Sequence, residues 1–247
     1  RQLLGRFERS RACARGLLRF QPPVSKGPVI MISKLFATPI YRANLDDERL
    51  RAELEKAILA RQTSQHEHPS SPQGKFHNVF ESRFNFLQEV SNPAIRQLSI
   101  QIDAHLNALL AVVTGSQPKD IDMKSLGCES WFHITTDSGY FQPHNHPNAS
   151  WSVVYCVNNG LAEDVGAADQ SGHLIFIDPR QSSMFLDQYA RKLHRDISFD
   201  GAKYFLAGGD IVIFPSYLQH YVSPYYGDAK RITVAANFWA KHRNEPS

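Results

Sequence analysis

The spacing of hydrophobic residues divides the chain into a helical first half and a strand-rich second half. Leucine and isoleucine recur near a 3.6-residue period, with acidic residues in the first turn, which predicts a helix over 45–61. A second helix is predicted to begin at Asn92-Pro93, a capping residue followed by a first-turn proline, and to end at Gly115. Residues 63–78 are polar and contain prolines, as expected of a loop.

After Gly115 the pattern changes to short apolar or alternating segments separated by Gly, Pro, Asn and Asp. These segments are SWFHIT, SWSVVYCV, HLIFI, KYFLA, DIVIF and RITVAANFW, and their length and alternation are typical of β-strands. Two helices followed by about eight strands predict a mainly β fold with flanking helices. We expect a double-stranded β-helix (jelly-roll or cupin-like) core over 120–240, with the helical part, 31–115, packed on one sheet.

The composition is that of an ordinary globular protein, with 42% hydrophobic and 21% charged residues among 247. The net charge of +3 is unevenly distributed, because residues 1–30 carry seven Lys and Arg against one acid, whereas residues 31–247 carry 20 against 23. We therefore expect residues 1–30 to be a basic leader outside the fold and residues 31–247 to be a single domain. The leader can be translated upstream sequence before Met31, a mitochondrial transit peptide or a genuine arm. The acidic balance of the domain argues against a nucleic-acid partner.

The cysteines Cys13, Cys128 and Cys156 are odd in number and widely spaced, which fits neither a disulfide framework nor a Cys-based zinc site. This usage favours a reducing compartment. No segment approaches the roughly 20 apolar residues that span a bilayer. We expect a soluble cytoplasmic protein with no membrane partner, or a mitochondrial one if residues 1–30 are a true transit peptide.

The first candidate for chemistry is the histidine pair His144 and His146, just before the strand predicted from about Ser150 to Val157. Both imidazoles can project from one side of the chain there. Fe(II) in oxygenases prefers imidazole and carboxylate ligands on one face of an octahedron, with open positions for a co-substrate and O2. The pair alone is also compatible with an ordinary turn, because Asn and Pro surround it.

The second candidate lies in residues 208–239. His220 begins a strand, and Arg231 and Thr233 open the RITVAANFW segment. We expect these two strands to be antiparallel neighbours joined by the turn at YYGD, which places Arg231 alongside His220 between the sheets. A guanidinium there can bind a carboxylate with two parallel hydrogen bonds, and the Thr233 hydroxyl on the same face can add a third.

Together these residues resemble the 2-oxoglutarate/Fe(II)-dependent oxygenase superfamily. In that superfamily a His-X-Asp/Glu pair opens one strand, a distal His follows, and an Arg-X-Ser/Thr further along binds the far carboxylate of 2-oxoglutarate. The matching pieces here are His144-Asn145-His146, His220 and Arg231-Ile232-Thr233. The resemblance covers roughly residues 120–240. GYFQPHNHPN is similar to the prolyl hydroxylase site, and KLFATPIY together with HNHP is similar to a poorly characterised bacterial branch of the superfamily.

The resemblance implies that His144, His146 and His220 bind Fe(II), that Arg231 and Thr233 bind 2-oxoglutarate, and that O2 takes the remaining position. One departure is that His146 stands where the family has its carboxylate ligand, which raises the charge of the iron site by one unit. Two interpretations remain open. His146 can be the third metal ligand of a three-His site, like those on related cupin barrels. Alternatively, His146 can contact the ligands without binding the metal, because related aspartyl/asparaginyl hydroxylases lack the carboxylate ligand altogether.

Another position implied by the resemblance is His133. Counted from the Gly139-Tyr140 turn, it matches a prolyl hydroxylase tyrosine that touches 2-oxoglutarate. A hydrogen-bonded core histidine is an equal alternative. On the strand after His146, Ser152 and Cys156 alternate with Val153 and Tyr155, so one of these two faces lines the cavity, but the sequence does not say which.

The function implied is a non-haem Fe(II), 2-oxoglutarate-dependent dioxygenase, most commonly a hydroxylase, acting on a small-molecule, amino-acid or peptide substrate. One alternative is a three-His cupin dioxygenase without 2-oxoglutarate, against which Arg231 and Thr233 argue. Another is a non-catalytic cupin-like protein that binds a metal or ligand. Residues 160–172 and the loop after Pro179 are candidates for a lid, with Arg180 either contacting an anionic substrate or solvated. The apolar helix over 93–113 can pack between the subunits of a homodimer.

Overall fold

The computed structural model describes residues 17–20, 30–69, 78–161, 171–179, 192–194, 198 and 201–240. Ten of the strands within these residues form two antiparallel sheets. The major sheet has the order β3-β10-β7-β12-β5-β4 and the minor sheet the order β6-β11-β8-β9. This arrangement confirms the predicted double-stranded β-helix with flanking helices.

The strands of the major sheet are β3 (Tyr41–Asn44), β4 (Val79–Glu81), β5 (Leu126–Thr135), β7 (Trp151–Asn158), β10 (Asp210–Pro215) and β12 (Arg231–Ala240). Those of the minor sheet are β6 (Phe141–His144), β8 (Leu174–Phe176), β9 (Ala202–Tyr204) and β11 (His220–Val222). The helices are α1 (Glu48–Leu59), α3 (Pro93–Thr114) and the short 3₁₀ helices η1 (Phe86–Gln88), η2 (Pro118–Asp120) and η3 (Met123–Ser125).

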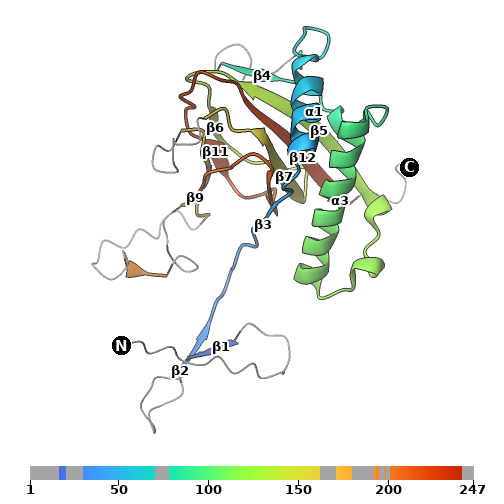
Figure 1. Ribbon diagram of the computed structural model, residues 1–247. Helices are drawn as coiled ribbons and strands as arrows, with labels where there is room; N and C mark the ends of the chain where they lie inside the picture. Colours follow the sequence, from blue (N-terminus) through green and yellow to red (C-terminus); the bar gives the residue numbers. More distant parts are fainter. Residues whose placement is uncertain are drawn as a thin grey trace, which may run out of the picture.

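Near the start of the chain, β1 (Leu17–Phe20) and β2 (Ile30–Ser33) pair as a separate antiparallel hairpin. Figure 1 shows this hairpin apart from the two sheets, connected to β3 by an extended segment. Residues 1–16 and 21–29 lie outside the described residues, so the expectation that residues 1–30 form a leader stays a prediction.

α3 begins and ends where its sequence signals place it, whereas α1 is shorter at both ends than the predicted helix over 45–61. The Asp47 carboxylate caps α1 by accepting a hydrogen bond from the Leu50 N–H at 2.8 Å. The Asn92 side chain accepts from the N–H groups of Ala94 and Ile95, and Gly115 ends α3 in the left-handed conformation at φ 70°. Local capping chemistry therefore determines both ends of the predicted second helix.

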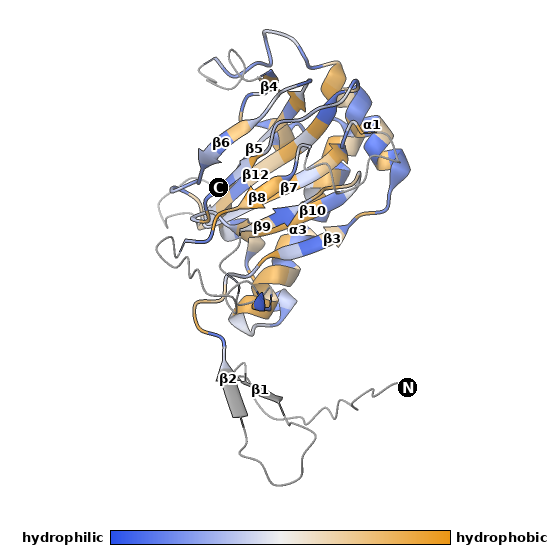
Figure 2. Cartoon of the chain, turned by 90° about the vertical axis from the view of Figure 1, so that its left-hand side faces the viewer, coloured by the Kyte–Doolittle hydropathy of each residue, from blue (hydrophilic) through white to orange (hydrophobic). Residues whose placement is uncertain are grey.

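The two helices cover one face of the major sheet (Figure 1). Leu54 and Ile58 of α1 and Leu98, Ile102 and Leu106 of α3 are fully buried in one hydrophobic cluster with the strands. The strand side of this cluster consists of residues from β5, β7, β10 and β12, among them Ile134, Tyr155, Ile213, Ile232 and Val234. In Figure 2 the central strands and α3 are largely hydrophobic in colour. The prediction that the helices pack on one sheet is confirmed, and among the described helices none could cross a membrane.

Side chains alternate along the central strands, which divides the interior into two layers. On β12, Ile232 and Val234 face the helices, whereas Arg231, Thr233 and Asn237 face the space between the sheets. The same alternation places Tyr155 of β7 against the helices, while Ser152, Val154 and Cys156 of β7 face the interior. The question left open by the sequence is thereby answered for β7.

Three strands of the two sheets were not predicted from the pattern. The segments YRAN of β3 and VFE of β4 lie at the two edges of the major sheet, and β6 reads FQPH. Each has only three or four residues, too few for a hydrophobic alternation to stand out from the surrounding loop. The part of the chain expected to be helical therefore also contributes the two edge strands of the major sheet.

Candidate metal and co-substrate site

Three histidines converge at one end of the space between the sheets. His144 ends β6, His220 begins β11 directly opposite it in the register, and His146 lies in the loop after β6. One ring nitrogen from each lies within 4.8 Å of the others. The ring centroids of His144 and His220 are 4.3 Å apart, and those of His146 lie 5.1 and 5.4 Å from them. His144 lies before β7, as the sequence predicted, and it also ends the short strand β6, which was not predicted.

The hydrogen bonds of two of these rings determine which nitrogen is available to a metal. His144 Nδ1 lies 2.7 Å from the Gln142 carbonyl oxygen, and His220 Nδ1 lies 2.9 Å from the Leu218 carbonyl oxygen. A carbonyl oxygen only accepts, so Nδ1 carries the proton in both rings. Nε2 of each ring is therefore left with its lone pair, which is the tautomer that binds a metal through Nε2.

The cluster also favours uncharged imidazoles. Burial, and then the neighbouring His144, lower the pKa of His146 to about 4 and the pKa of His220 to about 3. Burial likewise lowers the pKa of His144. At neutral pH all three rings are thus neutral, and their lone pairs are not occupied by protons. Imidazole–metal bonds of about 2.0–2.1 Å would draw the three nitrogens closer together on binding.

Arg231 lies in the same cavity as the histidines and is 3% exposed. Among the described residues, no carboxylate or other hydrogen-bond acceptor pairs with its guanidinium. Its side chain packs against Gly172, where an added Cβ would come within 3.1 Å of Arg231 Cδ and Nε. Burial lowers the pKa of this guanidinium. Because an unpaired buried cation is costly, this position fits an anionic ligand such as the far carboxylate of 2-oxoglutarate.

Thr233 is 3% exposed and lines the cavity on the same face of β12 as Arg231. The same cavity is also lined by Leu174, Phe214 and Val222. A dicarboxylate that reached from Arg231 to the imidazoles would therefore lie in a partly apolar cavity. Such a lining excludes water and strengthens the charge interactions at both ends.

One sequence-based expectation about this region is wrong. The strands that carry His220 and Arg231 are not antiparallel neighbours, because β11 pairs with β6 and β8 in the minor sheet and β12 pairs with β5 and β7 in the major sheet. The connection between them crosses from one sheet to the other. His220 and Arg231 therefore face the cavity from opposite walls, a placement that the strand pattern alone could not distinguish from a hairpin.

His133 lines the cavity and is also hydrogen-bonded, a position compatible with both alternatives considered for it. Its Nε2 lies 3.0 Å from Glu81 Oε2 on the neighbouring strand and 3.0 Å from Trp131 Nε1. One ring nitrogen cannot donate to a carboxylate and accept from an indole at the same time. The charge-assisted bond to Glu81 is the stronger one, which places the proton on Nε2. Whether His133 touches 2-oxoglutarate stays a prediction.

Several cavity residues were not singled out by the sequence. Trp131, 5% exposed, has its ring centroid 5.8 Å from that of His146. Asn237 lines the same cavity and could have been found by continuing the period-two pattern from Arg231 along β12. Glu81 carried no such signal, because its contact with His133 depends on how β4 pairs with β5. Tyr155, considered as core or pocket lining, is core.

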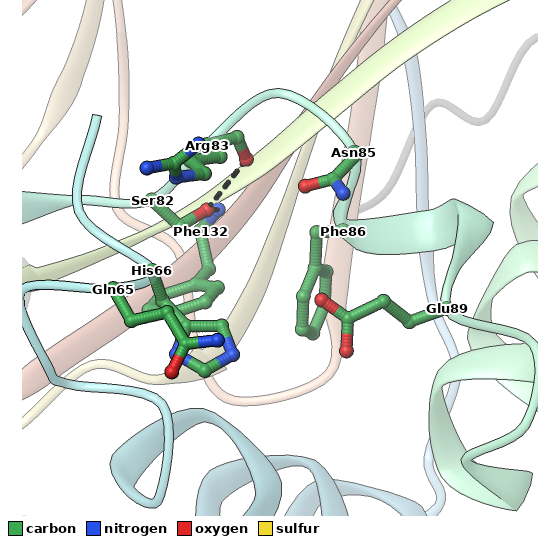
Figure 3. A pocket seen from close by; sticks show the side chains of 8 residues that line it. All are labelled: Gln65, His66, Ser82, Arg83, Asn85, Phe86, Glu89 and Phe132. Atoms are coloured by element: carbon green, nitrogen blue, oxygen red, sulfur yellow. Dashed lines mark hydrogen bonds between the residues drawn. The ribbon is translucent and has the colours of Figure 1, made fainter. Parts of the chain in front are cut away.

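A second cavity, of about 310 Å³, lies behind β5, on the face that carries Phe132. Figure 3 shows Gln65 and His66 below Arg83, with Glu89 directed in from the side. Its single lining carboxylate, Glu89, is already paired with Arg61 at 2.7 Å. This cavity therefore lacks a set of metal ligands, and the smaller cavity at the three histidines is the chemically significant one.

Two predictions fall partly outside the described residues. Arg180 lies there, as do residues 162–170 of the segment considered for a lid and most of the loop after Pro179. Neither the lid nor a contact of Arg180 with substrate is tested.

Cys156 is fully buried, and burial raises the pKa of its thiol to about 12. It is therefore no thiolate ligand, consistent with a site of imidazoles.

Comparison with known proteins supports the same interpretation. Residues 129–237 match the model of a family described as "Putative 2OG-Fe(II) oxygenase", and this span contains all six predicted site residues. They are His133, His144, His146, His220, Arg231 and Thr233. No curated protein matches the chain in sequence.

Several solved structures are similar in fold. They include HygX from Streptomyces hygroscopicus with nickel and 2-oxoglutarate bound (TM-score 0.53, 11% identity, 82% of this chain and 83% of that one). A prolyl hydroxylase from Trichoplax adhaerens, in complex with a hypoxia inducible factor peptide fragment, has a TM-score of 0.55 at 13% identity, over 81% and 83% of the chains. The epimerase SnoN from nogalamycin biosynthesis has a TM-score of 0.55 at 13% identity, over 82% and 79%.

At these identities the structural likeness establishes the fold alone, a double-stranded β-helix. The family match also covers the residues of the site, because it includes both the histidine cluster and the buried Arg231. The family description names the metal and the co-substrate that the sequence analysis predicted, Fe(II) and 2-oxoglutarate. Residues 129–237, which hold the three histidines and Arg231, are thus similar to the 2OG-Fe(II) oxygenase family.

Proposed function

We propose that the protein is a 2-oxoglutarate-dependent hydroxylase in which His144, His146 and His220 bind Fe(II). Arg231 and Thr233 bind the far carboxylate of 2-oxoglutarate. The observation that supports this most strongly is the buried guanidinium of Arg231, which has no acceptor among the described residues and shares a cavity with three neutral imidazoles. A site that bound only a metal would have no use for such a cation.

Each residue has a defined task in this proposal. The Nδ1 bonds of His144 and His220 to backbone carbonyls hold their rings in orientation, so that Nε2 faces the metal. The Arg231 guanidinium offers two parallel N–H donors to the distant carboxylate, and Thr233 offers a hydroxyl. When bound, Fe(II) activates O2 for a reaction that converts 2-oxoglutarate, O2 and a substrate C–H bond into succinate, CO2 and an alcohol.

His133 is proposed to contact 2-oxoglutarate from the wall of β5. Its bond to Glu81 holds the ring against the cavity and, with the proton on Nε2, leaves Nδ1 as an acceptor. Through its bond to His133, Glu81 also brings a carboxylate near the proposed metal site, whose three ligands include no carboxylate. Glu81 acts electrostatically on both His144 and His146.

The substrate is proposed to be a small molecule, an amino acid or a peptide. Proteins of the same fold include one complexed with a peptide fragment and one that is an epimerase, so the fold does not restrict the outcome to hydroxylation. Hydroxylation is the outcome we favour, because it is the commonest in the family.

A three-His dioxygenase that works without 2-oxoglutarate is the competing enzyme, and the identity of His146 is the observation that favours it. The two functions differ in what they consume. Protein loaded anaerobically with Fe(II) and 2-oxoglutarate, then exposed to O2 without further substrate, is expected to form succinate slowly. His220→Ala and Arg231→Ala should each abolish this formation, while Arg61→Ala, outside the cavity, should not. Iron binding without any consumption of 2-oxoglutarate would favour the competing enzyme.

A homodimer through α3 is also proposed. Ile100 is 61% exposed and Val112 is 81% exposed, and with Ala104 and Ala108 they form an exposed stripe at four-residue spacing. Light scattering after gel filtration should give twice the chain mass for the wild type and the single mass for Ile100→Glu. A monomeric wild type at micromolar concentration would exclude the dimer.

A further inference from the structure

A line of polar side chains, buried except for the half-buried Glu129, crosses the interior face of the major sheet next to the histidines. Glu129 of β5, Asn237 of β12 and Ser152 of β7 are direct cross-strand neighbours, and Ser216 follows immediately after β10. Asn237 and Ser152 are each 2% exposed and Ser216 is fully buried. Polar groups so deep in the interior persist only when their hydrogen bonds are satisfied, so their arrangement is specified.

The hydrogen bonds of this line run in one direction. Asn237 Nδ2 donates to Glu129 Oε1 at 3.1 Å, and Ser152 Oγ donates to Asn237 Oδ1 at 2.8 Å. A serine hydroxyl has one proton, so Ser152 Oγ must accept at its other contact, and Ser216 Oγ donates to it at 2.8 Å. The Glu129 carboxylate therefore orients every donor in the line, as far as Ser216.

Ser216 in turn holds the loop that carries His146. Its backbone oxygen accepts a hydrogen bond from the His146 N–H at 3.0 Å, and its backbone N–H donates to the Ser150 oxygen at 3.0 Å. Ser216 also begins the turn that leads to His220, whose ring is anchored on the Leu218 oxygen. One buried residue thus fixes the spacing between the loop of His146 and the strand of His220.

His146 depends on this support more than the other two histidines. The rings of His144 and His220 each bond to a backbone carbonyl two residues earlier. Among the described residues, the His146 ring has no hydrogen bond; its ring neighbours are the other two histidines, at 5.1 and 5.4 Å, and Trp131, at 5.8 Å. Its placement toward a metal therefore depends on where its backbone is held.

We infer that the Ser216–Ser152–Asn237 line positions His146 as the third metal ligand, with Ser152 as the central positioning residue. The inference rests on the proposed metal site and concerns only how one ligand is held there. If Ser152 acts through His146, its effect on metal affinity should disappear when His146 is removed. If the line only stabilises the sheet, its effect should be independent of His146.

The test is a thermodynamic cycle of Co(II) binding to metal-free protein, followed by absorption or calorimetry. Ser152→Ala should weaken Co(II) binding about tenfold, the lower end of what is typical for groups that orient a metal ligand. In a His146→Ala background, the same substitution should change Co(II) affinity by less than about twofold. Ser216→Ala removes the same hydrogen bond from its other side and should reproduce both results if Ser152→Ala fails to fold.

Ser130 supplies the matched control. It is a fully buried serine on β5 whose hydroxyl accepts from the Leu87 N–H and donates to Gln88, away from the histidines. Ser130→Ala should lower the melting temperature without changing Co(II) affinity. Equal weakening by Ser152→Ala with and without His146, or the same weakening by Ser130→Ala, would overturn the inference. A wild-type protein that bound no Co(II) would instead remove the proposed metal site and this inference with it.

Discussion

Replacement of Arg231 by methionine separates a ligand-binding arginine from a structural one. Methionine preserves much of the side-chain volume but removes the charge and all five N–H donors. In the structure the guanidinium is 3% exposed and pairs with no described acceptor, so its removal leaves no partner behind in the protein. The metal-free, ligand-free variant should therefore be as stable as the wild type, or more stable.

The effect on 2-oxoglutarate binding should be large. Truncation of one partner of a buried, hydrogen-bonded charge pair typically costs about 2–5 kcal/mol, or roughly 30- to 4,000-fold in Kd. A ligand at one hundred times its Kd stabilises a protein by about 2.7 kcal/mol, which in a chain of this length raises Tm by roughly 5–11 °C. At the same concentration Arg231→Met should retain less than about 1 kcal/mol of this stabilisation, or under about 4 °C.

The assay is thermal unfolding with Ni(II), with and without 2-oxoglutarate, because nickel avoids turnover. Arg61→Met is the control, since Arg61 pairs with Glu89 outside the cavity. The control should lose a little stability and keep the full shift with 2-oxoglutarate. An undiminished shift in Arg231→Met would refute the carboxylate clamp. A ligand-free Arg231→Met that unfolded several degrees lower would show that Arg231 is needed for the fold.

Two further predictions concern the histidines. The unfolded chain protonates His146 and His220 near pH 6.5, whereas the folded chain does so only near pH 4 and pH 3. The unfolded state therefore binds more protons as pH falls below about 6.5, and the metal-free protein should lose up to about 1.4 kcal/mol of stability per histidine per pH unit. Urea unfolding between pH 7.5 and 4.5 measures this, and a flat profile would contradict neutral buried imidazoles. Separately, His146→Asp should keep Fe(II) binding and succinate formation, whereas His146→Ala should weaken metal binding at least about tenfold; equal losses in both would argue that His146 is no ligand.

Several features of the fold and the site follow from signals that are local in sequence. Asn92 and Gly115 fixed both ends of α3 because capping is decided within a few residues. The histidines and Arg231 could be grouped because the family spacing links them, and the structure brings them into one cavity. Features whose geometry is determined by residues close together in sequence, such as the ends of α3, were predicted correctly.

The remaining features depend on how distant strands pair. The three-residue strand β4 gave no pattern of its own, so the contact between Glu81 and His133 could not be expected. The expected hairpin between the strands of His220 and Arg231 failed because a short connection can also cross between two sheets. The line from Ser152 to Asn237 required the register of β7 against β12, which period-two alternation alone does not supply.

The most direct test of the central claim is an anaerobic titration of the Fe(II)-loaded protein with 2-oxoglutarate, followed by visible absorption. The account predicts a new charge-transfer band that saturates at one equivalent of 2-oxoglutarate per chain and disappears on admission of O2 as succinate forms. It also predicts no band in His220→Ala and a much weaker affinity in Arg231→Met. A protein that binds Fe(II) but shows no spectral change with 2-oxoglutarate, and no succinate after O2, would contradict it.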